Sequence, residues 1–244
     1  MFYYRAKPDQ VSYGEAIGII LLDSRAPFIP GDVANATTYS FPVRFQKVPG
    51  LTVERIFNHD LSLIDDVIEA ALELKANGVR AITGDCGFMA LFQEKIARSV
   101  GLPVFMSSLL QVPFISRLIG ANEKIGIVTA NAGALDSAVL KPCGADLPEK
   151  LAIGGLEHCP AFRSAFIEEE GELDSLKVEE EVVSAALKIL EKDPEVRLML
   201  LECSVLPPYG AAVQQAAGLP VFDYVTMINY VYSAVVKQRF EGFM

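Results

Sequence analysis

An internal repeat constrains the fold of this chain more than any other feature. Residues 79–105 align without a gap on residues 196–222, and the constant offset of 117 positions carries Cys86 onto Cys203. The string Gly-Leu-Pro-Val-Phe follows each cysteine at the same distance, which makes duplication a better explanation than chance. We therefore predict two homologous halves, each of which contributes one thiol.

A second, shorter repeat opens each half. Ile-Gly-Ile at residues 17–19 matches Ile-Gly-Ile at residues 125–127, and the offset of 108 places Asn131 in register with Asp23. Continuous apolar runs of this β-branched kind are typical of fully buried parallel strands. Helical patterns alternate with these runs, so the predicted class is α/β, with parallel sheets covered by helices on both sides.

The repeats predict two pseudo-symmetric domains, each a parallel sheet flanked by helices, with an active-site cleft between them. We expect an N-terminal domain over residues 1–118 and a C-terminal domain over residues 119–222. A last amphipathic helix starts near Asp223, and the segment 223–244 is expected to pack back on the N-terminal domain.

Periodicity and capping residues predict the individual elements. Strands are expected over residues 17–22, 79–83, 104–106, 124–130, 151–156, 197–201 and 221–222, with weaker strand patterns at 37–45 and 52–57. Helices are expected over residues 63–76, 88–99, 107–118, 135–140, 178–190 and 209–217. The segment 26–49 is rich in Pro, Gly, Asn and Thr, which predicts a long loop that is either a lid or an ordinary surface excursion.

Charge and hydropathy argue against several classes of protein. The 244 residues carry a formal net charge of −10, which argues against an extended nucleic-acid-binding surface. The chain has no stretch near the roughly 18 apolar residues of a membrane helix, and its N-terminus lacks the apolar core of a signal peptide. We expect a cytoplasmic protein that binds neither nucleic acid nor membrane.

Neither a metal nor a cofactor is indicated by the motifs. The two histidines, His59 and His158, stand in no ligand-like spacing, and the four cysteines show no close Cys-x-x-Cys pair, so reduced thiols and no metal are expected. No phosphate-binding Gly-x-Gly-x-x-Gly or Gly-x-x-x-x-Gly-Lys-Ser/Thr motif occurs. The expected cofactor is therefore none.

Chemically useful side chains follow the strands of both halves. Asp23, Cys86, Asn131 and Cys203 each stand at the carboxyl end of a predicted strand, and Thr129 ends the strand before Asn131. Ligands of open parallel sheets bind beyond these ends, so one cleft between the halves is predicted. Thr129 and Asn131 are candidates for substrate binding, although Asn131 also suits the start of the following helix.

The two cysteines suggest acid–base chemistry at carbon. Cys86 and Cys203 each precede a helical pattern, where free N–H groups and the helix dipole lower the pKa of a thiol from about 8.5 toward neutrality. Such a group removes or returns a proton efficiently near neutral pH. Two of them on opposite sides of one carbon would invert a stereocentre, because one thiolate removes the proton and the other thiol delivers one to the opposite face.

The same two corners offer donors for the substrate. The N–H groups around Gly87 and Phe88, and around Ser204 and Val205, are expected to hold a carboxylate and to stabilise an enolate-like state. Gly87 is expected to let the substrate approach closely, because it has no side chain. The predicted partner is a small molecule with a carboxylate or carbonyl group.

Several motifs together resemble one known superfamily. Gly-Asp-Cys-Gly-Phe at 84–88, Leu-Glu-Cys-Ser-Val-Leu-Pro-Pro-Tyr at 201–209, the two Ile-Gly-Ile strands and the Gly-Leu-Pro-Val-Phe strings are similar to the aspartate/glutamate/hydantoin racemase superfamily. The resemblance covers nearly the whole chain. It implies two pseudo-symmetric α/β domains, catalysis without a cofactor such as pyridoxal phosphate, and one base from each domain at the positions of Cys86 and Cys203.

The resemblance also extends to Ser24 and to the expected reaction. Ser24, after Asp23, matches the Asp-Ser that follows the first strand of glutamate racemases, which implies substrate binding at both positions. The implied activity is that of an isomerase, a cofactor-independent racemase or epimerase for an aspartate- or glutamate-type amino acid or a related compound. A homodimer is the favoured assembly.

Departures from the family pattern leave the substrate open. Characterised glutamate and aspartate racemases commonly have Cys-Asn-Thr and Cys-Thr at the two corners, whereas this chain has Cys86-Gly87-Phe88 and Cys203-Ser204-Val205. The pocket is therefore expected to be less polar. Hydantoin racemase and an activity like that of arylmalonate decarboxylase or an isomerase remain alternatives, and retention of both cysteines favours racemisation over decarboxylation.

A different class and several individual roles also stay open. Two α/β lobes around a cleft describe small-molecule binding proteins as well, although paired thiols argue against that class. Strand alternation predicts that Asp85 and Glu202 point away from the thiols, toward an ion pair or an interface. His158 lines the cleft or is structural, Cys143 and Cys159 are expected to be core residues, and the acidic run 168–172 is expected to be a solvated loop.

Overall fold

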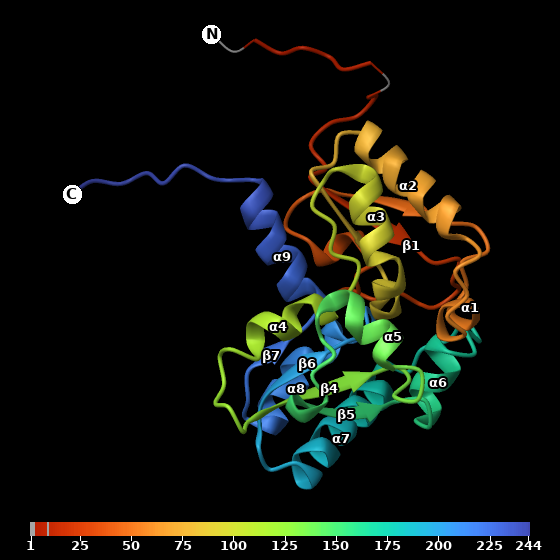
Figure 1. Ribbon diagram of the computed structural model, residues 1–244, viewed down its shortest axis with the longest axis vertical. Coiled ribbons are helices and arrows are strands. Elements are labelled where there is room, and N and C mark those ends of the chain that lie inside the picture. Colours follow the sequence, from red (N-terminus) through yellow and green to blue (C-terminus); the bar gives the residue numbers. More distant parts are fainter. Residues whose placement is uncertain (1–2, 9) are drawn as a thin grey trace.

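The computed structural model describes residues 3–8 and 10–244, and it contains two parallel sheets with helices packed around them (Figure 1). The first sheet has the order β2-β1-β3, with β1 (Ile17–Leu21), β2 (Val43–Lys47) and β3 (Ala81–Gly84). The second has the order β5-β4-β6-β7, with β4 (Lys124–Thr129), β5 (Leu151–Gly155), β6 (Val196–Leu201) and β7 (Val221–Phe222). The predicted α/β class with parallel sheets is confirmed.

Helices and short 3-10 helices connect the strands. Those of the first half are η1 (Ala36–Thr38), α1 (Val53–Phe57), α2 (Ile64–Ala76), η2 (Gly87–Phe92), α3 (Gln93–Val100), η3 (Ser108–Gln111) and α4 (Val112–Ile115). Those of the second half are α5 (Ser137–Leu140), η4 (Lys141–Cys143), η5 (Pro148–Lys150), α6 (Pro160–Phe166), α7 (Ser175–Lys192), η6 (Pro207–Tyr209), α8 (Gly210–Ala217) and α9 (Tyr224–Val235).

The sequence repeat is also a structural repeat. The offset of 117 positions carries α3 onto α8, and both helices end at a left-handed glycine, Gly101 with φ 64° and Gly218 with φ 65°. The bridge between Ile82 and Val104 in the first half corresponds to the pairing of Met199 with Val221 in the second. The duplicated segments therefore share their strand register as well as their helix.

Two predicted strands differ in the structure. Residues 53–57 form α1, because the Thr52 side chain accepts a hydrogen bond from the Arg55 N–H and caps a helix. Residues 104–106 form only a bridge to β3. The Phe105 carbonyl accepts a hydrogen bond from the Thr83 hydroxyl at 2.6 Å, and the Met106 N–H donates to the Gln93 side chain at 2.8 Å, so side chains satisfy the groups that would extend the strand.

The helical prediction over residues 107–118 is shortened for a similar reason. Ser107 caps the 3-10 helix η3, and Pro113 stands in the first turn of α4, as the fixed φ of proline favours. Two other predicted elements are present with different bounds or a different start. The weak strand pattern at 37–45 becomes η1 followed by β2, and the helix predicted at 88–99 begins as the 3-10 helix η2 and continues as α3.

One hydrophobic core spans both halves. Ile20 and Ile82 of the first sheet belong to the same buried cluster as Ile127 and Leu200 of the second. On the other face of the first sheet, α9 buries Tyr224 with residues of β1 and β3. The Tyr224 hydroxyl donates a 2.7 Å hydrogen bond to the Met106 carbonyl, so the last helix is fixed to the first half, and Figure 1 shows the blue helix α9 at the left side of that half.

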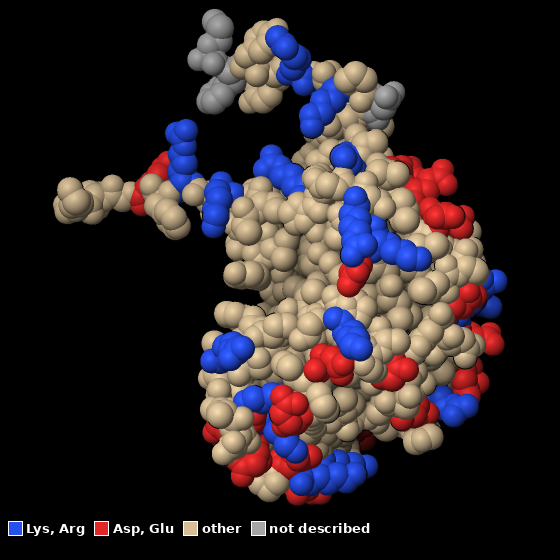
Figure 2. Space-filling model, viewed as in Figure 1, with Lys and Arg blue, Asp and Glu red and all other residues tan. Residues whose placement is uncertain are grey.

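The surface carries both signs of charge. Lys and Arg side chains alternate with Asp and Glu around the lower end of the view in Figure 2, where α7 lies. Over the residues that the structure describes, no helix has both the length and the apolar character needed to cross a membrane.

The left-handed conformation of Gly218, like that of Gly101, predicts that a side chain at this position destabilises the fold. Gly218→Ala should lower the free energy of unfolding by about 1 kcal/mol, because a Cβ at φ 65° is strained even though no atom lies within 4 Å of the added methyl group. Gly218→Asn should lower it less, since asparagine tolerates this conformation. Urea denaturation of both variants measures the difference, and an alanine variant as stable as the parent would contradict the argument.

Candidate active site

A cavity between the two halves contains both matched cysteines. It lies at the carboxyl ends of β1, β3, β4 and β6, where parallel sheets place ligands. Cys86 and Cys203 both line it, from the first and the second half respectively. The other lining residues are Leu22, Ser24, Ala26, Phe28, Val53, Phe57, Asp85, Phe88, Ala130, Phe162, Phe166, Ser204 and Val205.

The two corners that carry the thiols have the same backbone turn. The Met89 N–H donates to the Cys86 carbonyl at 3.0 Å, and the Leu206 N–H, 117 positions later, donates to the Cys203 carbonyl at 3.1 Å. The N–H groups of Phe88 and Val205 interact with the two thiols and favour their anionic forms. Duplication has therefore produced two equivalent thiol corners.

Burial raises the pKa of both thiols, whereas the sequence predicted lowered values. Cys86 is 7% exposed and Cys203 is 9% exposed, and burial is the main cause of the rise. Neighbouring acidic groups add to it, among them Cys203 and Glu202 around Cys86, and Glu202 around Cys203. The N–H groups of Phe88 and Val205 oppose the rise but do not outweigh it. The prediction was wrong because short 3-10 turns, not long helices, follow the thiols, and because nonlocal carboxyl groups surround them.

Three carboxyl groups are buried near the thiols. Burial raises the pKa of Asp85 and of Glu202 to about 7 each, and raises that of Asp32 well above its usual range. Asp85 accepts a hydrogen bond from the Leu22 N–H at 3.0 Å. Among the described residues neither Asp85 nor Glu202 has a cationic partner, so the predicted ion pair is absent there, and Asp85 lines the cavity instead of pointing away from it.

Glu202 is held directly against the first thiol corner. One of its side-chain oxygens, Oε2, accepts a hydrogen bond from the Thr129 hydroxyl at 2.9 Å, and the other, Oε1, is buried without a partner. A Cβ at Gly87 would lie 1.6 Å from Oε1. Gly87 is therefore required for the fit of this carboxyl group, a role that differs from the close approach of substrate that the sequence suggested.

The structure brings together some predicted site residues and separates others. Cys86, Phe88, Cys203, Ser204, Val205 and Ser24 line the cavity. Asp23 instead pairs with Lys47 at 2.8 Å, and the Asn131 side chain accepts from the Ala134 N–H at 3.1 Å, so Asn131 stabilises a turn. Thr129 acts on Glu202 and does not line the cavity.

Other residues of the cavity were not predicted from the sequence. Phe28, Phe57, Phe162 and Phe166 come from three separate segments with no shared spacing that would reveal them. Glu169, in the acidic run expected to be a solvated loop, accepts hydrogen bonds from the Ser24 hydroxyl and from the Arg25 N–H. This contact joins the two halves beside the cavity. The free volume of the cavity is about 40 Å³.

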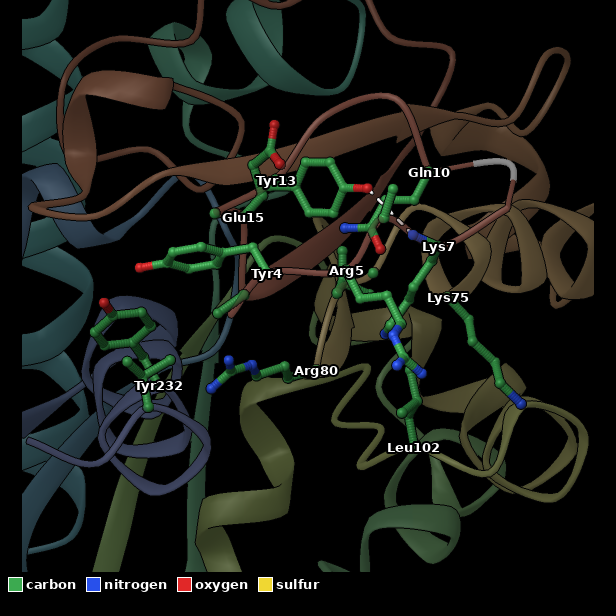
Figure 3. Close-up of a pocket in the computed structure, with 16 residues that line it drawn as sticks. Tyr4, Arg5, Lys7, Gln10, Tyr13, Glu15, Lys75, Arg80, Leu102 and Tyr232 are labelled. Carbon is green, nitrogen blue, oxygen red and sulfur yellow. Dashed lines mark hydrogen bonds between the residues drawn. The ribbon is translucent and has the colours of Figure 1, made fainter. Parts of the chain in front are cut away.

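A larger hollow of about 1010 Å³ lies at the opposite end of the first sheet. Its lining includes Ala16 before β1 and Val79 before β3, so it faces the amino ends of these strands. Figure 3 shows the side chains that surround it, among them Tyr4, Arg5, Lys7, Gln10, Tyr13, Lys75, Arg80 and Tyr232. No cysteine lines this larger hollow. The smaller cavity, which Cys86 and Cys203 line, is therefore the candidate active site.

Metal binding has no support within the described part of the chain. No group of three or more His, Cys, Asp and Glu side chains there is arranged to hold a metal ion. His158 is not among the residues that line the cavity, and all four cysteines are free. Cys143 and Cys159 also lie outside it.

The contact between Gly87 and Glu202 predicts a coupled pair of substitutions. Gly87→Ala should lower the free energy of unfolding by about 2 kcal/mol, because the new methyl group overlaps Oε1 in a packed interior. Glu202→Ala in the same chain removes the overlap with the side chain and leaves only the 2.9 Å approach of the backbone carbonyl, so the double variant should lose less than the sum of the single losses. Gly133→Ala is the matched control, since its Cβ would lie 3.4 Å from the nearest atom. Additive losses in urea denaturation would contradict the contact.

The raised pKa values of Asp85 and Glu202, about 7 each, predict a loss of stability as pH rises. Between about pH 4 and 7 the unfolded chain loses these protons while the folded chain keeps them, so each group lowers the free energy of unfolding by up to about 1.4 kcal/mol per pH unit. Glu202→Gln should therefore show a shallower decline over this range. Urea denaturation at several pH values measures it, and equal slopes would count against a neutral Glu202.

Comparison of the sequence with known proteins identifies relatives of this chain. A dimethylsulfoniopropionate lyase from Durusdinium sp. clade D is 33% identical over 222 residues, which cover 88% of this chain and 73% of that protein. Dimethylsulfoniopropionate lyase 3 from Emiliania huxleyi (strain CCMP1516) is 36% identical over 235 residues, or 91% of this chain and 60% of that protein. The chain thus spans between three fifths and three quarters of the length of these two relatives. No protein-family model matches it.

Solved structures share the fold at lower identity. Arylmalonate decarboxylase superposes with a TM-score of 0.58 at 16% identity, covering 90% of this chain and 91% of that one. A glutamate racemase isoform from Bacillus anthracis gives 0.59 at 13% identity, covering 92% and 85%. The chain therefore shares its fold with these two enzymes, whereas the sequence relatives named above are dimethylsulfoniopropionate lyases. By its sequence similarity, the chain belongs to the dimethylsulfoniopropionate lyase family.

Proposed function

We propose that this chain is a lyase that cleaves a small β-sulfonio carboxylate, dimethylsulfoniopropionate, into dimethyl sulfide and acrylate. The observation that carries the proposal is the placement of Cys86 and Cys203 at one buried cavity. The identity of 33% and 36% to proteins named as lyases of this compound supports the choice of substrate.

The reaction balances without an oxidant or a cofactor. A thiolate takes a proton from the carbon next to the carboxylate, and the electrons of that C–H bond form the carbon–carbon double bond. The bond from the neighbouring carbon to sulfur breaks, and both of its electrons go to the sulfonium, which leaves as neutral dimethyl sulfide. Acrylate remains, and the proton now on the thiol passes to solvent.

The cavity supports this chemistry in two ways. First, the N–H groups of Phe88 and Val205 point at the thiols, so they stabilise negative charge as it develops there. Second, the site is largely closed to water, which strengthens these interactions and protects a carbanion-like state from premature protonation. Of the two thiols in the cavity, one acts as the base and the other carries a proton to or from it.

Racemisation remains a second candidate because both thiols are present. A racemase uses one group to remove a proton and the other to return one on the opposite face, and Cys86 and Cys203 come from different halves. The lining, however, contains no Lys, Arg or His to bind the second carboxylate of aspartate or glutamate. The cavity composition therefore favours a monocarboxylate and the lyase reaction.

Substitution of the thiols tests the proposal. With dimethylsulfoniopropionate as substrate, Cys86→Ser and Cys203→Ser should each lower kcat at least about 100-fold, because serine is a far weaker acid than cysteine. Cys159→Ser is the matched control, since Cys159 lies outside the cavity, and it should keep the activity of the parent. Dimethyl sulfide in the headspace and acrylate in solution report the reaction.

Two outcomes would contradict the lyase proposal. One is full release of dimethyl sulfide by either cavity variant while its fold is intact. The other is no release by the parent protein, combined with exchange of the α-proton of a single amino-acid enantiomer in deuterated water and loss of optical rotation. The second result would identify a racemase.

A further inference from the structure

We propose that five phenylalanines around the thiol cavity form a binding site for a fully alkylated onium cation, and that this cation supplies the positive charge that the protein does not place beside its thiols. The aromatic wall consists of Phe28, Phe57, Phe88, Phe162 and Phe166. The ligand class is a small carboxylate with a sulfonium or quaternary ammonium group. The inference rests on the proposed lyase function and deepens it, because it says how the cationic end of the substrate is recognised.

The aromatic wall is built from both halves. Phe57 of α1 and Phe88 of η2 are in edge-to-face contact, with ring centroids 5.0 Å apart. Phe162 and Phe166 of α6 come from the second half, with centroids 5.2 Å apart. Aromatic faces attract cations through the ring quadrupole, and alkylated onium groups are the ligands that clustered rings recognise in proteins.

The charges of the cavity are suited to a cation. Asp85 is the one charged-type side chain among the described residues that line it, and no Lys, Arg or His is among them. Asp32 and Glu202 are buried close by, since their charges act on the pKa of Cys203. A bound cation would therefore meet no like charge, whereas a second carboxylate on the substrate would be repelled by any of these groups that ionised.

Hydrogen bonding favours an alkylated cation over a primary ammonium group. An ammonium group donates three hydrogen bonds and needs acceptors, whereas methyl groups on sulfur or nitrogen need none. Apart from Asp85, Ser24 and Ser204, the side chains of the lining are apolar or thiols, so the cavity offers few acceptors to an ammonium group. The aromatic rings pack against the methyl groups, and their faces attract the positive charge.

A cation at this place would also change the thiols. Burial and neighbouring acidic groups keep Cys86 and Cys203 protonated in the free protein, since both raise the pKa of each thiol. An opposite charge within a few ångströms favours the ionised form. The onium group of the substrate thus promotes formation of the thiolate that removes the proton from the neighbouring substrate carbon, and a molecule of the same shape without this positive charge would not.

A matched pair of ligands tests the onium site. 3-(Trimethylammonio)propanoate and 4,4-dimethylpentanoate have nearly the same shape and differ in the charge of one atom. Isothermal titration of the full chain should show that the ammonium compound binds about tenfold more tightly, as expected for a desolvated cation against aromatic rings. Equal or tighter binding of 4,4-dimethylpentanoate would overturn the proposal.

Variants of the half-buried rings Phe28 and Phe57 test whether these rings cause the preference for the ammonium compound. Phe28→Leu and Phe57→Leu should each reduce the preference for the ammonium compound at least about threefold, while Phe57→Tyr, which keeps a ring, should retain it. Phe114→Leu is the control, because Phe114 is exposed on α4 and does not line the cavity. An unchanged preference in both leucine variants, with cooperative thermal unfolding as in the parent, would place the onium group elsewhere and refute the assignment.

The ionisation of the thiols gives an independent measurement. Addition of the ammonium compound at neutral pH should raise the ultraviolet absorbance of thiolate, and the rise should be lost in Cys86→Ser with Cys203→Ser combined. No rise on saturation would refute the electrostatic part of the proposal.

Failure of the lyase function is distinguishable from failure of the onium site. Preference for the cation without release of dimethyl sulfide would leave the onium site intact and reject the reaction. Release of dimethyl sulfide with no preference for the cation would do the opposite.

Discussion

The site depends above all on the removal of acidic groups from water. Cys86, Cys203, Asp85 and Glu202 are all buried where the two sheets meet, and within the described chain no cation accompanies them there. Ionising any one of them would place an unpaired charge in a poorly solvated region, so burial raises the pKa of each group and favours its neutral form. The buried acids therefore weaken the fold least when they keep their protons, and their ionisation depends on what occupies the cavity beside them.

Duplication explains why the two thiol corners have the same backbone, and divergence explains why their side chains differ. The two thiol corners share one turn, but Gly87 stands where the second half has Ser204, and Phe88 stands where it has Val205. These differences link the halves. Glu202 of the second half fits against Gly87 of the first, and the Ser204 hydroxyl donates to the Asp85 carbonyl. The halves are therefore joined by contacts at the site itself as well as by the hydrophobic core that they share.

Features encoded by local pattern could be predicted from the sequence, and features that depend on nonlocal neighbours could not. The repeat predicted the parallel strands and nominated Cys86 and Cys203, because strand register follows from the apolar pattern. Capping hydrogen bonds of single side chains decided the exceptions, such as the helix after Thr52. Thiol ionisation was predicted with the wrong sign, since the burial of a group and the approach of Glu202 are set by tertiary packing. The aromatic wall has no sequence signature for the same reason.

The unequal surroundings of the two thiols have a stereochemical consequence. The two hydrogens of a methylene group are equivalent in free solution and become distinct in a chiral environment. In this cavity one thiol stands beside Gly87 and the other beside Ser204, so the two hydrogens of a bound methylene face different neighbours. When an elimination yields an achiral alkene, that discrimination leaves no trace in the configuration of the product. The handedness of the site is then expressed only in which of two enantiotopic hydrogens departs.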